Sequence, residues 1–149
     1  MLKLSRRTTT AAALTVLALG GTLAATAPAS AATTAAGAYN GACGAGYTVQ
    51  DSMDVKSSQT TVAGTVYVTY SRDTGKHCAV LVRTKPGTRI FMEVTLDTAP
   101  TSGTPARDYG SFTTYAGPVY VDASQSDAPC LEWSGSVDIY YNSVQGLCS

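Results

Sequence analysis

The sequence predicts an all-β fold, a small antiparallel β-sandwich or, as the alternative, a small β-barrel, tied by two disulfides. Three observations support this fold class. Short runs of β-branched and aromatic residues alternate with polar residues at period two, and turn-forming residues separate the runs. No segment shows sustained helical periodicity. Four cysteines are present, at positions Cys43, Cys78, Cys130 and Cys148. Regular short strands over some 110 residues are typical of sandwiches and small barrels.

The N-terminal region has the organisation of a secretory signal peptide. A positively charged start, Lys3 to Arg7, precedes an apolar run from Ala11 to about Ala25. Small residues follow, and they place the predicted cleavage after Ala31, with cleavage after Ala29 as the alternative. The apolar run is shorter than the roughly 20 residues that a membrane-spanning helix needs. We therefore expect removal of this segment and export of the rest.

Cleavage after Ala31 leaves 149 − 31 = 118 residues, which fits one domain. We expect residues 32–38 to form a flexible tail and residues 39–149 to form a single disulfide-tied β domain. The shortened chain has seven basic and ten acidic residues, a net charge of 7 − 10 = −3. Because the basic residues are scattered along the sequence, we expect no nucleic-acid partner and, after signal removal, no membrane partner. The sequence does not indicate an oligomeric state.

The four cysteines predict two disulfides, because an even number in an exported chain is typical of a disulfide framework. Three pairings are possible. We expect Cys43–Cys78 and Cys130–Cys148, since this pairing ties each terminal segment to a nearby strand. A metal site is disfavoured because the chain has no Cys-x-x-Cys pair and a single histidine, His77. We expect no metal and no cofactor.

The central part of the chain predicts a hairpin followed by an amphipathic strand. After a first strand over Tyr47–Val55, the runs Thr65–Tyr70 and His77–Thr84 flank the polar turn Arg72–Gly75. Ile90–Asp97 then gives the clearest alternation of apolar and polar residues. In the second hairpin strand, alternation predicts that His77 lies on the side opposite the core. It places three residues on the core face: Cys78, Val80 and Val82.

The C-terminal part predicts shorter strands between longer loops. Thr98–Asp108, with two prolines, is expected to be an exposed loop. Strands are expected over Tyr109–Thr113 and Val119–Asp122, around a turn at Tyr115–Pro118. Leu131 and Trp133 should share one face of the next strand, and Val137–Tyr141 should form the last.

Residues that could carry catalysis are few, and we predict none to be catalytic. His77 has Asp73 nearby in sequence, but no Gly-x-Ser-x-Gly elbow accompanies it, so it is interpreted as an exposed histidine at a strand start. The acids Asp51 and Asp54, or Glu132 and Asp138, could form a pair for glycoside hydrolysis. Scattered surface charges are the alternative explanation. Arg107 in the proline-bounded loop allows a protease-inhibitor alternative.

The aromatic content indicates a possible binding surface. Nine of the twelve aromatic residues are tyrosines. Tyrosine suits exposed stacking faces because its ring packs while its hydroxyl stays hydrated. Such a face could take sugar rings or a protein; the alternative is that the rings fill a thin core and its rim. The candidates are Tyr67, Tyr109, Tyr115, Tyr120, Trp133, Tyr140 and Tyr141.

Several ordered segments together carry a family resemblance. They are Tyr39–Tyr47, Val66–Tyr70 with Thr74–Cys78, Gly110–Tyr120 and Cys130–Gly135. In order and spacing they resemble the spore-associated protein family of filamentous actinobacteria, over nearly all of the chain after residue 31. The resemblance implies a secreted, non-enzymatic protein at the surface of spores or aerial hyphae, with cell-wall or spore-surface components as partners. It supplies no catalytic residues. A small secreted protease inhibitor and, third, a wall-polymer hydrolase are the alternatives.

Overall fold

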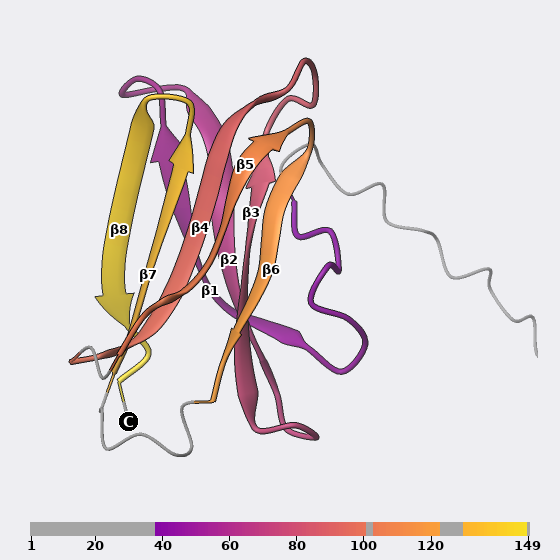
Figure 1. Ribbon diagram of the computed structural model, residues 1–149, viewed down its shortest axis with the longest axis vertical. Coiled ribbons are helices and arrows are strands. Elements are labelled where there is room, and N and C mark those ends of the chain that lie inside the picture. Colours follow the sequence, from indigo (N-terminus) through magenta and orange to yellow (C-terminus); the bar gives the residue numbers. More distant parts are fainter. Residues whose placement is uncertain (1–37, 101–102, 123–129, 149) are drawn as a thin grey trace, which may run out of the picture. The chain divides into compact units, whose positions relative to one another are not determined.

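Two antiparallel four-stranded sheets face each other in a β-sandwich (Figure 1). The computed structural model describes residues 38–100, 103–122 and 130–148. The predicted signal peptide and almost all of the predicted tail lie outside these ranges. Within them, no helix is long and apolar enough to cross a membrane. The predicted all-β sandwich is confirmed.

Eight strands build the two sheets, and each strand pairs with its neighbours in antiparallel register. Sheet A has the order β1-β2-β3-β6, and sheet B has the order β5-β4-β7-β8. In chain order the strands are β1 (Thr48–Lys56), β2 (Val62–Ser71), β3 (Lys76–Arg83), β4 (Ile90–Ala99), β5 (Ala106–Phe112), β6 (Tyr115–Val121), β7 (Cys130–Val137) and β8 (Tyr140–Gly146).

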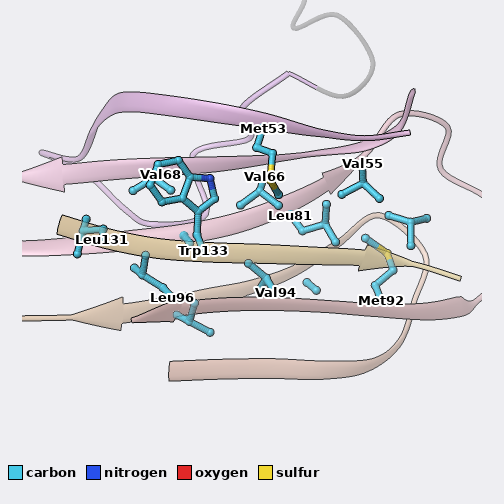
Figure 2. Packing of buried hydrophobic residues seen from close by; sticks show 14 residues of the cluster. Met53, Val55, Val66, Val68, Leu81, Met92, Val94, Leu96, Leu131 and Trp133 are labelled. Carbon is cyan, nitrogen blue, oxygen red and sulfur yellow. The ribbon is translucent and has the colours of Figure 1, made fainter. Parts of the chain in front are cut away.

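The main core fills the space between the sheets. Alternation in β4 sends Met92, Val94 and Leu96 inward, where all three are fully buried. Leu131 and Trp133 on β7 are buried on the same face, as predicted. Figure 2 shows these side chains meeting Val66, Val68 and Leu81 from sheet A. Burial of apolar surface on both inner faces is what holds the two sheets together.

The edges of the two sheets are joined by polar contacts. On one side, Asn142 of β8 donates from Nδ2 to the backbone oxygen of Asp54 on β1 (2.9 Å). On the other side, the backbone N–H of Gly117 on β6 donates to Oδ2 of Asp108 on β5 (2.7 Å). Both bonds cross from one sheet to the other, so they occupy polar groups at edges that would otherwise be open to pairing with another chain.

The outer face of sheet A carries a second apolar layer, which corrects one expectation from the sequence. Cys78, Val80 and Val82 face away from sheet B and are buried beneath the segment Tyr39–Tyr47. Ala79 and Leu81 of β3 face the main core instead. The expected core face was therefore the wrong one. Both faces of β3 are apolar, so alternation could not tell which of them meets the partner sheet.

The position of His77 also differs from the one expected. It shares the inward face of β3 with Ala79 and lies against Tyr70, with ring centroids 4.7 Å apart. The side chain is half-buried at the end of the sandwich, so the expectation of a position opposite the core was wrong.

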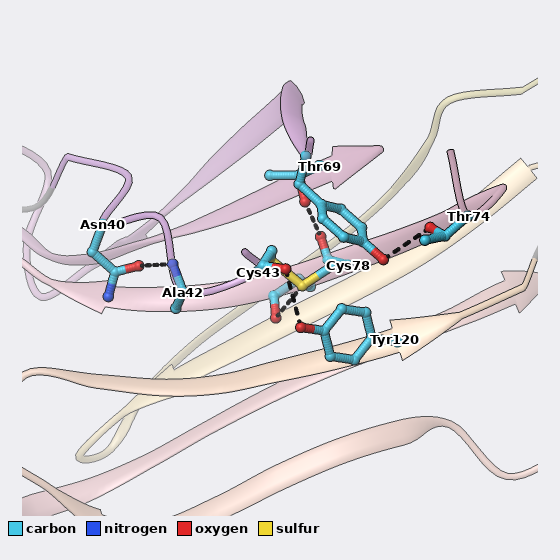
Figure 3. The surroundings of a disulfide bond; sticks show 9 residues. Asn40, Ala42, Cys43, Thr69, Thr74, Cys78 and Tyr120 are labelled. Carbon is cyan, nitrogen blue, oxygen red and sulfur yellow. Dashed lines mark hydrogen bonds between the residues drawn. A yellow bond between two sulfur atoms is a disulfide. The ribbon is translucent and has the colours of Figure 1, made fainter. Parts of the chain in front are cut away.

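Two disulfides fix the terminal segments, in the pairing expected from the sequence. Cys43–Cys78 ties the N-terminal segment to β3, and Cys130–Cys148 ties the start of β7 to the C-terminal segment. Around the first disulfide, Tyr120 donates to the backbone oxygen of Cys43 (3.2 Å), and Thr69 donates to that of Cys78 (3.2 Å) (Figure 3). The N-terminal segment is thus held by covalent and polar contacts together.

The largest differences from the predicted strands lie in the second half of the chain. β5 begins at Ala106, so Arg107 is a strand residue rather than a loop residue. The predicted last strand, Val137–Tyr141, was wrong: it spans the turn between the end of β7 at Val137 and the start of β8 at Tyr140, and β8 continues to Gly146. β6 begins at Tyr115 and contains the Gly117-Pro118 pair that predicted a turn. The pairing of β6 with β3 is shifted at this point, and Gly117 adopts φ +97°. A Cβ at Gly117 would lie 2.9 Å from the backbone oxygen of Ala79. A bulge built on glycine therefore replaces the expected turn.

Candidate functional site

The aromatic residues predicted to form one exposed surface are divided among three places. Tyr67, Tyr115 and Tyr120 lie on the outer face of sheet A, whereas Tyr109 and Tyr141 lie on the outer face of sheet B. The remaining two point inward. The seven aromatic residues therefore do not form a single face.

The two inward residues are excluded from any stacking face. Trp133 is 1% exposed and lies in the main core, so its inclusion among the exposed candidates was wrong. Tyr140 is opposite Val137 in the register and packs against the same core. Alternation in β7 places Trp133 on the same face as Leu131, and both are buried.

The tyrosines of sheet A mostly hold the N-terminal segment in place. The ring of Tyr67 lies 5.8 Å from that of Tyr39, and the ring of Tyr120 lies 5.7 Å from that of Tyr47 in an edge-on arrangement. Burial raises the pKa of Tyr67 and of Tyr120. Tyr115, at the end of β6, is 38% exposed and takes no part in this packing. This group is accounted for by the structure of the domain.

The outer face of sheet B carries the most exposed rings. Tyr109 is 60% exposed, Tyr141 is 64% exposed and Phe91 is 42% exposed. Cross-strand pairing aligns four residues from the four strands in the row Tyr109, Glu93, Ser136 and Tyr141. Three strand spacings separate the two tyrosines at the backbone, or about 14 Å. We call Phe91, Tyr109 and Tyr141, with Glu93 and Ser136 between them, the aromatic face.

Arg107 fixes one side of the aromatic face. Its Nε donates to Oε1 of Glu93 (2.6 Å), and its guanidinium carbon lies 4.2 Å from the centre of the Tyr109 ring. The hydrogen bond to Glu93 raises the pKa of Arg107. A cation stacked on the ring limits the rotamers open to Tyr109. Arg107 is also the residue that the sequence suggested for a protease-inhibitor loop, and these contacts already occupy its side chain.

Hydroxyl groups continue the face along the strands. The next row contains Thr95 and Ser134, whose side-chain oxygens are 2.7 Å apart and share a hydrogen bond. Exposed rings with polar groups between them suit sugar units, because a sugar presents apolar C–H faces as well as hydroxyls. The arrangement can therefore stack a sugar ring and hydrogen-bond its edge.

Phe91 was not among the residues predicted from the sequence. The signal was present, because Phe91 alternates with Met92 and Val94 and so falls on the polar face of the amphipathic β4. An aromatic residue on the polar face of a predicted strand indicates an exposed ring.

The residues considered for catalysis are not brought together. Asp51 pairs with Val68, a core residue, whereas Asp54 lies outside and accepts a hydrogen bond from Thr65 (2.9 Å). The two carboxylates therefore project from opposite faces of β1. Glu132 lies near the start of β7 and Asp138 follows its end, six residues or about 20 Å further along the strand. Neither pair has the separation that glycoside hydrolysis uses.

His77 lacks the surroundings of a catalytic base. Among the described residues its buried Nδ1 atom has no hydrogen-bond partner, so no carboxylate there orients the ring through this nitrogen. Burial lowers the pKa of His77. Across the described ranges, no group of three His, Cys, Asp or Glu residues is placed to hold a metal ion.

Comparison with known proteins gives one informative relative. The chain is 43% identical over 122 residues to spore-associated protein A of Streptomyces coelicolor, covering 80% of this chain and 73% of that protein. No family model matches the chain. No solved structure matches it either.

Proposed function

The chain belongs to the family of spore-associated protein A, and from this premise we propose that it is an exported, non-enzymatic domain of the spore or aerial-hypha surface. It attaches by binding a cell-wall glycan through the aromatic face. Its activity is adhesion rather than turnover.

Export is supported by two independent features. The N-terminal sequence has the charge, apolar run and small residues of a secretory signal. All four cysteines are paired in disulfides, which persist in oxidising compartments outside the cytoplasm. Export also agrees with the name of the Streptomyces relative, which associates that protein with spores.

Glycan binding rests on one observation, the exposed row that joins Tyr109 to Tyr141 across sheet B. Large exposed rings on a regular sheet are costly to leave in water and are enriched at binding surfaces. Glu93, Ser136 and Thr95 lie between and beside the rings and supply acceptors and donors for hydroxyl groups. No comparable observation in the described residues favours the inhibitor or the hydrolase.

Sedimentation with purified cell walls tests the proposal. The purified protein is mixed with walls stripped of protein, and the bound fraction is measured after centrifugation, with insoluble cellulose as an unrelated control glycan. We expect saturable binding to walls and recovery of the protein in denaturant washes of intact spores. A folded protein that stays in the supernatant and is absent from spore washes would contradict a surface role.

A further inference from the structure

The fold gathers basic residues that are scattered in the sequence. Strands β1, β3, β5 and β7 all end at the same end of the sandwich, where the loop of residues 84–89 lies (Figure 1). Four of the seven basic residues after residue 31 belong to this end. Asp138, in the β7–β8 turn, lies there as well. We call the following residues the basic end: Lys56, Arg83, Lys85 and Arg89.

The charge of the basic end is not neutralised within the protein. In the described part of the chain, none of its four cations lies within ion-pair distance of a carboxylate. Nη1 of Arg83 instead donates to the backbone oxygens of Thr88 (2.7 Å) and Thr113 (3.4 Å). Nη1 of Arg89 donates to the backbone oxygen of Ser111 (3.0 Å). Neutral carbonyls thus hold both guanidinium groups while leaving their charge and their other N–H groups available.

Two hollows flank the loop of residues 84–89. One, of about 330 Å³, is lined by Arg89 together with Ser111, Thr113, Thr114 and the exposed Tyr115. The other, of about 210 Å³, has Arg83 and Lys85 together with the hydroxyl-bearing Thr61 and Thr84 on its polar side, and Val62, Ala63, Ile90 and Val137 on its apolar side. Cations beside hydroxyl donors are the groups that recognise phosphate and carboxylate oxygens.

The loop between the hollows is fixed to the strands on both sides. The backbone N–H of Thr84 donates to the oxygen of Ala63 (3.0 Å), and that of Gly87 donates to the oxygen of Thr113 (3.3 Å). The backbone N–H of Arg83 donates to the oxygen of Thr114 (2.8 Å). The cations are therefore carried on an ordered frame, which lowers the entropy lost when a ligand binds.

We propose that the basic end is a second binding site, and that it takes an anionic polysaccharide with repeated phosphodiester or carboxylate groups, one charged group in each hollow. This site goes beyond the proposed glycan contact of the aromatic face and does not depend on it. A flexible polysaccharide is favoured over a nucleic-acid duplex because it can follow the basic end alone, whereas a stiff duplex would also run past the remaining surface, which carries most of the ten acidic residues.

Binding to two soluble polymers tests the site. Inorganic polyphosphate supplies repeated phosphates, polygalacturonate supplies repeated carboxylates on sugars, and dextran is the neutral control. We expect the purified protein to bind at least one of the two anionic polymers in about 50 mM salt, to lose that binding as screening increases towards 0.5 M, and to ignore dextran. Binding to polyphosphate alone assigns the phosphate-bearing class of polymer, and binding to polygalacturonate alone assigns carboxylates.

A matched pair of variants separates the effect of the basic end from the effect of net charge. Lys85→Gln with Arg89→Gln removes two positive charges at the basic end, and Arg72→Gln with Lys76→Gln removes two in the β2–β3 hairpin at the other end. We expect the first double variant to lose affinity about fivefold or more and the second to change little. Equal losses, or no binding to either polymer, would overturn the proposal, as would single-stranded DNA that binds more tightly than both polymers. A Tyr109→Ala, Tyr141→Ala variant should bind the anionic polymer normally, so failure of the aromatic face is distinguishable from failure of this site.

Discussion

The guanidinium carbon of Arg107 lies 4.2 Å from the centre of the Tyr109 ring on the outer face of sheet B. Glu93 accepts a hydrogen bond from the same side chain, so three residues from two neighbouring strands hold one another in a fixed arrangement. Exposed rings usually sample several rotamers, and ordering them on binding costs free energy. A ring that is already ordered binds a sugar at a lower cost.

Replacing Arg107 should therefore weaken wall binding more than it weakens the fold. We expect Arg107→Ala to lower wall affinity a few-fold while shifting the melting temperature little, because the ion pair is at the surface. Binding isotherms and thermal unfolding measure the two effects. Arg72→Ala, in the β2–β3 turn, is the control and should change neither. A large drop in melting temperature with unchanged binding would show that Arg107 serves the fold instead.

Loss of the first disulfide should expose an apolar surface that loss of the second leaves covered. We expect Cys43→Ser with Cys78→Ser, or Cys130→Ser with Cys148→Ser, to cost about 3–4 kcal/mol of unfolding free energy in the loop-entropy picture. The first change should also release the N-terminal segment from Val80 and Val82. An apolar dye should then bind to the first variant and not to the second under native conditions. Equal dye binding by both would contradict the role given to Tyr39–Tyr47.

Close packing between the sheets should make Gly135 sensitive to substitution. A Cβ added there would lie 2.5 Å from Cγ2 of Val66 and 3.2 Å from Cγ2 of Val55. We expect Gly135→Ala to destabilise the domain by about 1–3 kcal/mol, since extra atoms in a packed core force neighbours to move. Gly103 has no atom within 4 Å of an added Cβ, so Gly103→Ala should stay within about 0.5 kcal/mol of the parent. Urea unfolding of the two variants provides the comparison.

His77 should make the domain less stable in mild acid. Burial lowers its pKa below the usual 6.5, so the unfolded chain takes up a proton before the folded one does. Its stabilising contribution is present at neutral pH, declines as the pH falls through 6.5, and is lost below the folded pKa. His77→Phe keeps a ring against Tyr70 and should remove this part of the pH dependence. Unfolding free energies from urea titrations at pH 7.5 and pH 5.5 measure this pH dependence. If the difference between the two pH values is the same in His77→Phe as in the parent, the effect belongs to carboxylates instead.

Much of the fold was predictable because the physical signals are local. Period-two alternation located the strands, and β4 was clear since one face is apolar and the other polar. The disulfide pairing followed from the terminal positions of Cys43 and Cys148. Alternation failed in β3, where Cys78, Val80, Ala79 and Leu81 are all buried, because a strand covered on both sides has no polar face to mark the outside.

The candidate sites depended on information that the sequence does not display. The row from Tyr109 to Tyr141 requires the strand order β5-β4-β7-β8, which joins residues more than thirty positions apart. The basic end likewise forms because antiparallel strands bring Lys56 and Arg89 to one end of the sandwich. The scattered positions of the basic residues along the chain gave no sign of this clustering, because it depends on strand order and register. Trp133 was predicted to share a strand face with the apolar Leu131, and that shared face, which is buried, was the sign that Trp133 does not belong among the exposed rings.

The most direct test of surface attachment compares wall binding by two tyrosine variants. Tyr109→Ala with Tyr141→Ala removes both ends of the row on sheet B, and Tyr120→Ala removes a partly exposed ring from sheet A. Both proteins are first checked by circular dichroism and urea unfolding, and their dissociation constants for purified walls are then measured in 0.5 M salt, where attraction to the basic end is screened. We predict a loss of about tenfold or more for the double variant, as for two lost stacking contacts, and less than about twofold for Tyr120→Ala. Equal affinity of the folded double variant and the parent would contradict the assignment of the aromatic face.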